Sequence, residues 1–257
     1  MKILDSEVHL WHADQCDFDV DQLQQACLAW LTEDEQRRYR RYQFDRHRLQ
    51  LLLGRFLMRS VLSQYEETIE ADQWRFVHNE FGKPAIEPEQ NSLGLYFNLS
   101  HSGNKLVLAV SKTEMIGVDI EAISKPRRVE KISTRYFSRQ EQDELLALPE
   151  SGRLHRFYQL WTLKEAYIKA CGLGLAIPLQ HFSYSFESEQ RLCIEFDAAR
   201  QDDARHWQIW QLAMNSAYYL ALAVKSKSNP SIESVSSWAL SGLEGFCSLD
   251  TRVLRKS

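Results

Sequence analysis

The sequence has no paired cysteines, no long apolar run and no excess of basic charge, and each absence excludes a class of protein. Its five cysteines are scattered without a Cys-x-x-Cys pair, so neither a disulfide framework nor a zinc site is expected: Cys16, Cys27, Cys171, Cys193 and Cys247. No segment approaches the roughly eighteen apolar residues of a membrane-spanning helix, and the charged N-terminus has no run of signal-peptide length. The formal net charge of −4 argues against general binding to nucleic acid. We therefore expect a cytoplasmic protein with reduced thiols that binds neither membranes nor nucleic acid.

What is present is an ordinary globular composition with one strongly basic segment. The 257 residues are 44% hydrophobic and 26% charged, enough for one large domain or two smaller ones. Thr32 with Glu35 three residues later is typical of a capping box and predicts one helix over 32–65, whose second part, 49–62, is apolar enough to be buried. Its arginines either form a solvated face balanced by nearby acids or bind an anion, because guanidinium groups suit phosphate oxygens: Arg37, Arg38, Arg40, Arg41, Arg46, Arg48 and Arg55.

A second helix, predicted over 156–171, has charged residues on one stripe. Trp161, Glu165 and Lys169 lie four positions apart and therefore share one side of this helix, and Gly172 is expected to end it. Taken alone, Glu165 and Lys169 are explained as well by an ordinary surface ion pair. Lys164 points off the stripe by roughly sixty degrees, and whether it is a solvated lysine stays open.

Polar residues also follow or interrupt the predicted strands. Residues 95–99 and 105–110 predict a hairpin whose loop holds Ser100, His101 and Ser102, either as turn residues or as a phosphate site. A further strand over 115–120 places Asp119 and Glu121 on one face by its period of two. Two acids that face one way are costly unless they are solvated or neutralised by a cation.

The remaining predicted elements have no chemical motif of their own. They are helices over 21–31 and 127–148, and strands over 3–11, 74–77, 182–186, 191–196, 206–213 and 217–225. Past residue 225 the composition is that of a linker, and the tail has spaced apolar residues that dock on the body or on a partner: Leu240, Leu243, Phe246 and Leu249.

Three stretches share the order and spacing of motifs found in one known family. They are Gly82-Lys83-Pro84 with residues 97–102 (FNLSHS), then residues 116–121 (IGVDIE), then residues 161–169 (WTLKEAYIK). Together they resemble the 4′-phosphopantetheinyl transferases of the surfactin-synthetase-activating (Sfp) type over roughly Leu31 to Pro178. The resemblance implies an α+β fold of two pseudo-symmetric halves, each a helix packed on a small, mostly antiparallel sheet.

The resemblance also implies a reaction. Such enzymes move the 4′-phosphopantetheine arm of coenzyme A onto a serine of an apo acyl or peptidyl carrier protein, use Mg²⁺, and release adenosine 3′,5′-bisphosphate. It implies that Mg²⁺, which prefers oxygen ligands, is held by Asp119, Glu121 and Glu165. Glu165 is implied as general base as well, and which of its two roles dominates stays open. Lys169 is implied to contact the pyrophosphate or assist the departing phosphate.

Coenzyme A needs further contacts for its nucleotide and its phosphates. By the same resemblance, Lys83, Ser100 and His101 fall at positions that bind them. The arginine-rich segment supplies another contact, for which we favour Arg48 first and Arg38 second.

The expected organisation is a coenzyme A-binding half over 1–113, a half with the metal site and catalytic helix over 114–225, and a linker and tail over 226–257, in a monomer. Two alternatives from other classes are a nucleotide- or RNA-binding module without catalysis and a metal-dependent phosphohydrolase. The same-face pair Asp119 and Glu121 together with Glu165 argues against a pure binder. Whether the carrier serves fatty-acid, polyketide or non-ribosomal peptide synthesis is not readable from one sequence.

Overall fold

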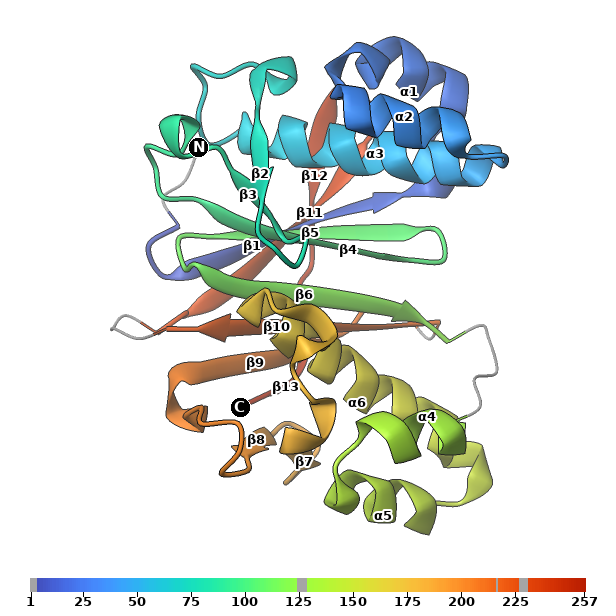
Figure 1. Ribbon diagram of the computed structural model, residues 1–257, viewed down its shortest axis with the longest axis vertical. Helices are drawn as coiled ribbons and strands as arrows, with labels where there is room; N and C mark the ends of the chain where they lie inside the picture. The colour runs from blue at the N-terminus through green and yellow to red at the C-terminus, as the bar shows by residue number, and fades with distance from the viewer. Residues whose placement is uncertain (1–3, 124–128, 216, 227–230) are drawn as a thin grey trace.

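The computed structural model describes residues 4–123, 129–215, 217–226 and 231–257, and it arranges the chain in four layers (Figure 1). In order, the layers are helix α3 (Asp45–Leu62) with its neighbours, a five-stranded sheet, a four-stranded sheet and helix α6 (Glu150–Cys171). Each sheet therefore has one face toward a helix and one toward the other sheet. Both faces must be apolar, which explains strands that are almost continuously hydrophobic.

The N-terminal half is the five-stranded sheet with its helices. The strand order is β12-β11-β1-β5-β4; β1 pairs in parallel with β11, and the other pairs are antiparallel. The elements are β1 (Glu7–Asp14), α1 (Val20–Cys27), α2 (Glu33–Arg41), β4 (Tyr96–Ser102), β5 (Lys105–Ser111), β11 (Ser234–Ser241) and β12 (Gly245–Leu249), with a small hairpin of β2 (Phe76–His78) and β3 (Pro84–Ile86).

The C-terminal half is the four-stranded antiparallel sheet under α6. Its strand order is β13-β9-β10-β6. The elements are β6 (Met115–Ala122), α4 (Val129–Tyr136), α5 (Arg139–Ala147), β9 (Trp207–Leu212), β10 (Tyr218–Lys225) and β13 (Val253–Lys256), with a separate hairpin of β7 (Phe182–Phe186) and β8 (Leu192–Phe196). The predicted α+β class, with a helix on a mostly antiparallel sheet in each half, is confirmed.

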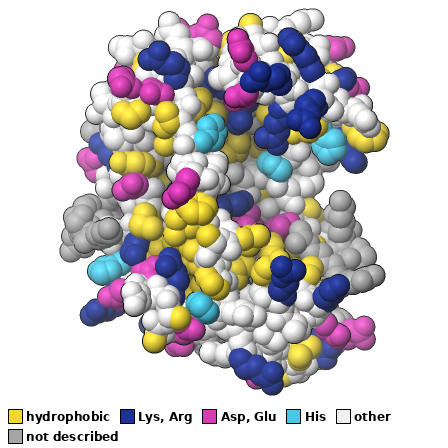
Figure 2. All heavy atoms as spheres, viewed as in Figure 1, with side chains coloured by type: hydrophobic (Ala, Val, Ile, Leu, Met, Phe, Trp, Pro, Cys, Tyr) yellow, Lys and Arg dark blue, Asp and Glu magenta, His cyan; other side chains and the backbone are white. Residues whose placement is uncertain are grey.

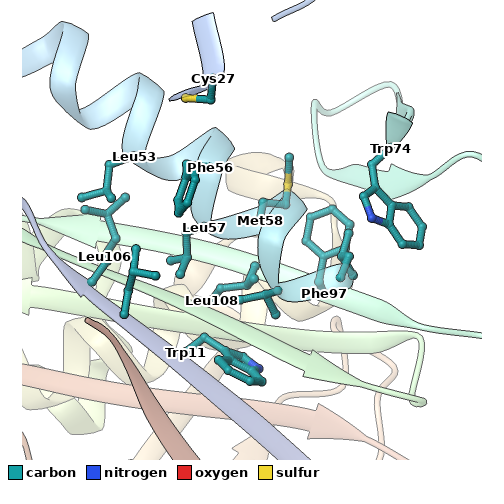
Figure 3. Packing of buried hydrophobic residues seen from close by; sticks show 14 of the residues in the cluster. Trp11, Cys27, Leu53, Phe56, Leu57, Met58, Trp74, Phe97, Leu106 and Leu108 are labelled. Carbon is teal, nitrogen blue, oxygen red and sulfur yellow. The ribbon is translucent and has the colours of Figure 1, made fainter. Parts of the chain in front are cut away.

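Alternation along the strands lets one strand serve two layers of core. In β5, Leu106 and Leu108 belong to the cluster under α3, and Figure 3 shows them opposite Leu53 and Leu57. The neighbouring Val107 belongs to the cluster between the two sheets. The core is thus continuous from one outer helix layer to the other.

The single helix predicted over 32–65 is wrong, because the chain breaks into α2 and α3 around Tyr42, whose backbone is extended. Glu35 forms ion pairs with Arg55 and Arg59, the latter at 3.6 Å. Residues twenty positions apart on one straight helix would lie about 30 Å apart. The ion pairs are therefore possible only because α2 folds back beside α3.

The predicted loop position of Ser100, His101 and Ser102 is also wrong. The three residues lie within β4, where Ser102 pairs with Lys105 of β5. The turn consists only of the two residues after them, and Gly103 has the positive φ of 56° that such a tight turn requires. The three side chains therefore alternate between the two faces of a strand.

The tail packs on the rest of the chain, which is one of the two alternatives left open by the sequence. β11 and β12 extend the first sheet beyond β1, whereas β13 extends the second sheet beyond β9. The predicted boundaries at residues 113 and 225 stay predictions. Across the ranges described above, no helix combines the length and the apolarity needed to cross a bilayer.

Candidate active site

A cleft of about 520 Å³ lies where the two halves meet. Its walls come from the adjacent edges of β4 and β6 and from α6, and its lining residues are Leu99, Ser100, His101, Asp119, Ile120, Glu121, Trp161, Glu165 and Lys169. The space-filling view shows a hollow between the halves, with Lys and Arg side chains gathered over α2 and α3 on one side of it (Figure 2). The structure thus brings the metal and catalytic residues predicted from three separate motifs into one cleft.

Helix α6 lies directly on β6 because Gly117 has no side chain. A Cβ added there would lie 2.1 Å from the carbonyl oxygen of Ala166 and 2.3 Å from the amide nitrogen of Ala170. Real structures do not contain such contacts, so only glycine allows this approach. Sequence reasoning did not single out Gly117, although a glycine inside a strand indicates a close backbone contact.

The close contact places Lys169 against Asp119 and Ser100. Lys169 Nζ donates to Asp119 Oδ1 at 2.6 Å and to Ser100 Oγ at 2.9 Å. Ser100 Oγ in turn donates to the same Asp119 oxygen at 3.0 Å. The ammonium group from α6, the hydroxyl group from β4 and the carboxylate from β6 therefore form one hydrogen-bonded group.

Asp119 is the most buried acid of the cleft, with 4% of its surface exposed. Burial, together with the neighbouring charge of Glu121, raises the pKa of Asp119 to about 6 against the opposing effect of Lys169. Its second oxygen, Oδ2, is buried and has no hydrogen-bond partner in the part of the chain that is described. A buried acceptor of this kind is suited to a cation that arrives with the substrate.

Glu121 is held between the two halves. Its Oε1 accepts from the indole N–H of Trp161 at 3.1 Å, and its Oε2 accepts from the hydroxyl of Ser102 at 3.1 Å. Trp161 packs against the core of the C-terminal half and also orients this acid. Glu165 lies between Trp161 and Lys169 on α6 and lines the same cleft.

His101 forms the rim of the cleft toward the N-terminal helices. Its Nδ1 hydrogen-bonds Gln50 of α3 at 2.6 Å. Burial, together with the charges of Lys169 and Arg38, lowers the pKa of His101. Arg38 itself, on α2, donates to the hydroxyl group of Tyr42 at 2.7 Å.

Three predicted coenzyme A contacts, Arg38, Arg48 and Lys83, are not among the residues that line this cleft. Arg48 donates to Asp45 at 3.0 Å and lies over the ring of Tyr39. Lys83 donates to the carbonyl oxygens of Ile116 at 3.1 Å and Ala170 at 3.0 Å, and burial lowers its pKa to about 8. In this structure Lys83 therefore joins the N-terminal half to both β6 and α6.

Lys164, left open by the sequence, is completely buried. Its ammonium group contacts Glu141 at 2.8 Å and donates to the carbonyl oxygens of Leu179 at 2.8 Å and Phe182 at 2.7 Å. Glu141 also completes the capping box of α5 with Ser138. The solvated interpretation of Lys164 is wrong, because α5 and the segment before β7 cover this side of α6.

The comparisons with known proteins match both halves of the chain. Residues 115–223 match the 4′-phosphopantetheinyl transferase superfamily, and residues 11–113 match the N-terminal region of 4′-phosphopantetheinyl transferases. The transferase HetI of Nostoc is 33% identical over 87% of this chain and 90% of its own length. The transferase Sfp of Bacillus subtilis is 34% identical over 65% of this chain and 72% of its own.

The chain belongs to the Sfp-type 4′-phosphopantetheinyl transferases. The enzyme class predicted from the three motifs is confirmed, and the binding module and the phosphohydrolase are set aside. Among solved structures, the holo-[acyl-carrier-protein] synthase of Thermotoga maritima aligns with a TM-score of 0.36 and 21% identity, over 45% of this chain and 65% of that one. That likeness is too low to compare the two sites residue by residue.

The donor chemistry of this transferase fits a hard cation. Asp119 Oδ2 is buried and without a partner, and the carboxylates of Glu121 and Glu165 line the same cleft. No three Asp, Glu, His or Cys side chains in the described ranges already stand together as a metal-binding group. The amine of Lys169 instead balances Asp119. Asp119, Glu121 and Glu165 thus fit Mg²⁺ as part of its ligand set.

Proposed function

We propose that this transferase moves the 4′-phosphopantetheine arm of coenzyme A to a serine of an apo carrier protein and releases adenosine 3′,5′-bisphosphate. The observation that supports it is the meeting of Asp119, Glu121, Glu165 and Lys169 in the cleft between the halves. Acids and an amine in one cleft suit the transfer of a phosphoryl group, because the charge on the phosphates must be neutralised and the proton of the nucleophile must be accepted.

The proposed ligands of Mg²⁺ are Asp119, Glu121 and Glu165. When bound, the ion would neutralise charge on the pyrophosphate of coenzyme A. Lys169 already donates to Asp119 and Ser100, and its ammonium group has one further hydrogen for a phosphate oxygen. We assign it to the phosphate that leaves.

The serine hydroxyl of the carrier is the proposed nucleophile. Its oxygen forms a bond to the β-phosphorus while the bond from that phosphorus to the bridging oxygen breaks, and the bridging oxygen departs with adenosine 3′,5′-bisphosphate. The proton of the hydroxyl passes to the carboxylate of Glu165, directly or through water. This proposal is supported by the position of Glu165 on α6, where it lines the cleft together with Lys169.

The N-terminal half is proposed to bind the nucleotide part of coenzyme A. Ser100 and His101 line the cleft, and Arg38 is close enough to influence His101. Arg48 and Lys83 stay predictions, because their present partners are Asp45 and main-chain carbonyl groups. One chain supplies both walls of the cleft, so we propose that the enzyme is a monomer. We also propose that it acts in the cytoplasm.

Mass spectrometry of the carrier tests the proposal. The protein is incubated with coenzyme A, Mg²⁺ and each of several apo carrier proteins from fatty-acid, polyketide and non-ribosomal peptide synthesis. We expect at least one carrier to gain the mass of phosphopantetheine, and to lose that gain with a chelator or when its acceptor serine is alanine. An unchanged mass on every carrier tested would contradict the proposed function.

A further inference from the structure

Three side chains of β4 accept hydrogen bonds from the main chain of β6, although the two strands belong to different sheets. The pairs, which we call the β4–β6 ladder, are Asn98 with the Val118 N–H at 2.9 Å, Ser100 with the Ile120 N–H at 3.2 Å and Ser102 with the Ala122 N–H at 3.0 Å. The spacing of two residues on both strands follows from strand alternation. The ladder joins the halves through side-chain oxygens in place of main-chain carbonyl groups.

In two of these three pairs, the β4 side chain also donates a hydrogen bond to an acid of β6. Ser100 Oγ donates to Asp119 at 3.0 Å, and Ser102 Oγ donates to Glu121 at 3.1 Å. Each serine therefore accepts from the amide that follows an acid and donates to that acid. A hydroxyl group has one hydrogen and two lone pairs, so both bonds are compatible. Asn98 makes the ladder bond to Val118, which follows Gly117, and no hydrogen bond from Asn98 to an acid is found in the described ranges.

The bond from Ser102 fixes Glu121 from the N-terminal half. The other oxygen of Glu121 accepts from Trp161 on α6, which belongs to the C-terminal half. One donor on each oxygen sets both the position and the rotation of the carboxylate group. Ser102 therefore acts on the carboxylate oxygen of Glu121 that Trp161 does not contact.

We infer that Ser102 is a positioning residue for Glu121, as Ser100 is for Asp119, and that it prepares Glu121 to hold a divalent cation. The inference rests on the proposed function, which makes Glu121 a ligand. A hydroxyl group that only joined the sheets would need no bond to the acid, and Asn98 shows that the ladder bond exists without one. Residues that orient metal ligands in this way commonly change metal affinity when they are removed.

The first experiment measures Mn²⁺ binding to the full chain with coenzyme A present and no carrier protein. The electron paramagnetic resonance signal of free Mn²⁺ is followed during the titration, and a titration without protein corrects for Mn²⁺ bound by coenzyme A itself. We expect Ser102→Ala to weaken binding roughly 10- to 100-fold, the range found for residues that orient metal ligands. Ser102→Thr retains the hydroxyl group and should restore binding.

Asn98→Ala is the matched control, because it removes a ladder bond whose side chain donates to no acid in the described ranges. It should lower the melting temperature and leave Mn²⁺ affinity unchanged. Equal losses of affinity in Asn98→Ala and Ser102→Ala would overturn the inference, because the ladder would then act only through the fold. If Ser102→Ala does not fold, Ser102→Val against Ser102→Thr repeats the comparison with two side chains of equal shape.

A double-mutant cycle tests whether Ser102 acts through Glu121. In a Glu121→Gln background, Ser102→Ala should cause no additional loss of Mn²⁺ affinity. A full additional loss would show that Ser102 acts elsewhere and would overturn the inference.

The two proposals fail differently. If the parent protein modifies a carrier and Ser102→Ala leaves its Mn²⁺ affinity unchanged, the inference fails alone. If no carrier is modified but Ser102→Ala weakens Mn²⁺ binding with rescue by threonine, the proposed function fails and the positioning role stands. A parent protein that binds no Mn²⁺ in the presence of coenzyme A would overturn both.

Discussion

Each half has a long helix that packs on its sheet, α3 or α6, which we call the main helix. In each half, a shorter helix begins with a capping box, and the glutamate of that box forms an ion pair with a buried basic residue of the main helix. In the N-terminal half, Glu35 of α2 pairs with Arg59 of α3, and in the C-terminal half Glu141 of α5 pairs with Lys164 of α6. The halves thus share a device that no repeat in the sequence reveals. It fixes the main helix of each half against its neighbours.

The halves differ in how that main helix contacts its sheet. A Cβ added to Gly54 of α3 would meet Leu99 at 3.4 Å, an ordinary contact with a flexible side chain, whereas one added to Gly117 of β6 would meet main chain at 2.1 Å. The looser contact is apolar, with Leu53, Phe56 and Leu57 buried in it. The tighter contact lets short polar and charged side chains reach one another across it. Both halves pack a helix on a sheet, so the fold type does not distinguish them. What distinguishes the half with the proposed catalytic residues is the close contact between the main chains of β6 and α6 at Gly117.

Substitution of these two glycines tests the comparison directly. Gly117→Ala should cost roughly 3 kcal/mol or more of unfolding free energy, because main chain has to move, and should abolish transfer. Gly54→Ala should be neutral or stabilising by up to about 1 kcal/mol, because alanine favours helix. Chemical denaturation of both variants measures the two values, and a larger loss for Gly54→Ala would break the comparison.

The two buried bases should differ as well. Lys164→Met leaves Glu141 as an unpaired buried charge and should cost about 3–5 kcal/mol. Arg59→Met should cost less, because Arg55 still pairs with Glu35. Urea unfolding checks the order, and the double variant Lys164→Met/Glu141→Gln should recover part of the loss. No recovery would mean that the pair is not what stabilises α6.

The acids of the C-terminal half should affect chemistry more than folding. Asp119→Ala and Glu165→Ala should each lower transfer by at least roughly 10²-fold, because each removes a charged group that acts on the reacting phosphate. Their melting temperatures should stay near that of the parent, since no core cavity opens. Carrier modification followed by mass spectrometry measures the loss, and retained turnover in either variant would refute the site.

The smallest effects are expected in the coenzyme A-binding half. His101→Ala should raise the KM for coenzyme A roughly tenfold with little change in kcat, because it removes binding that is equal in ground and transition states. Lys83→Ala should raise the KM in the same way if Lys83 also binds coenzyme A, and it should cost roughly 1–3 kcal/mol of stability through its lost bonds to main-chain carbonyls. Lowered stability with an unchanged KM would leave Lys83 as a purely structural tie between the halves.

Local periodicity was enough to predict which side chains share a face. The alternation of β6 places Asp119 beside Glu121, and the helical spacing of α6 places Glu165 beside Lys169. The three-motif resemblance then linked these faces, since nothing in either period shows that β4, β6 and α6 meet. Their meeting depends on contacts between segments far apart in the chain.

The features missed by the sequence analysis are long-range for the same reason. Lys164 was ambiguous because its partner Glu141 lies on another helix, and the break before α3 allows ion pairs that join segments twenty residues apart. Gly117 was overlooked because its importance depends on Ala166 and Ala170, which a strand pattern does not contain. Spaced apolar residues in the tail indicated burial but not the strands that they join.

The parallel pairing of β1 with β11 also bears on how the protein folds as it is synthesised. Glu7 pairs with Ser234, so β1 gains this neighbour only after residues 8–233 have been made. Such a contact is slow to form, because closing the long loop is entropically costly before any pairing compensates for it. Until then β1 presents an unpaired edge to other nascent chains. The antiparallel strands β9 and β10 are close in sequence and face no such delay, but their sheet is complete only when β13, which follows β11 and β12 in the chain, pairs with β9.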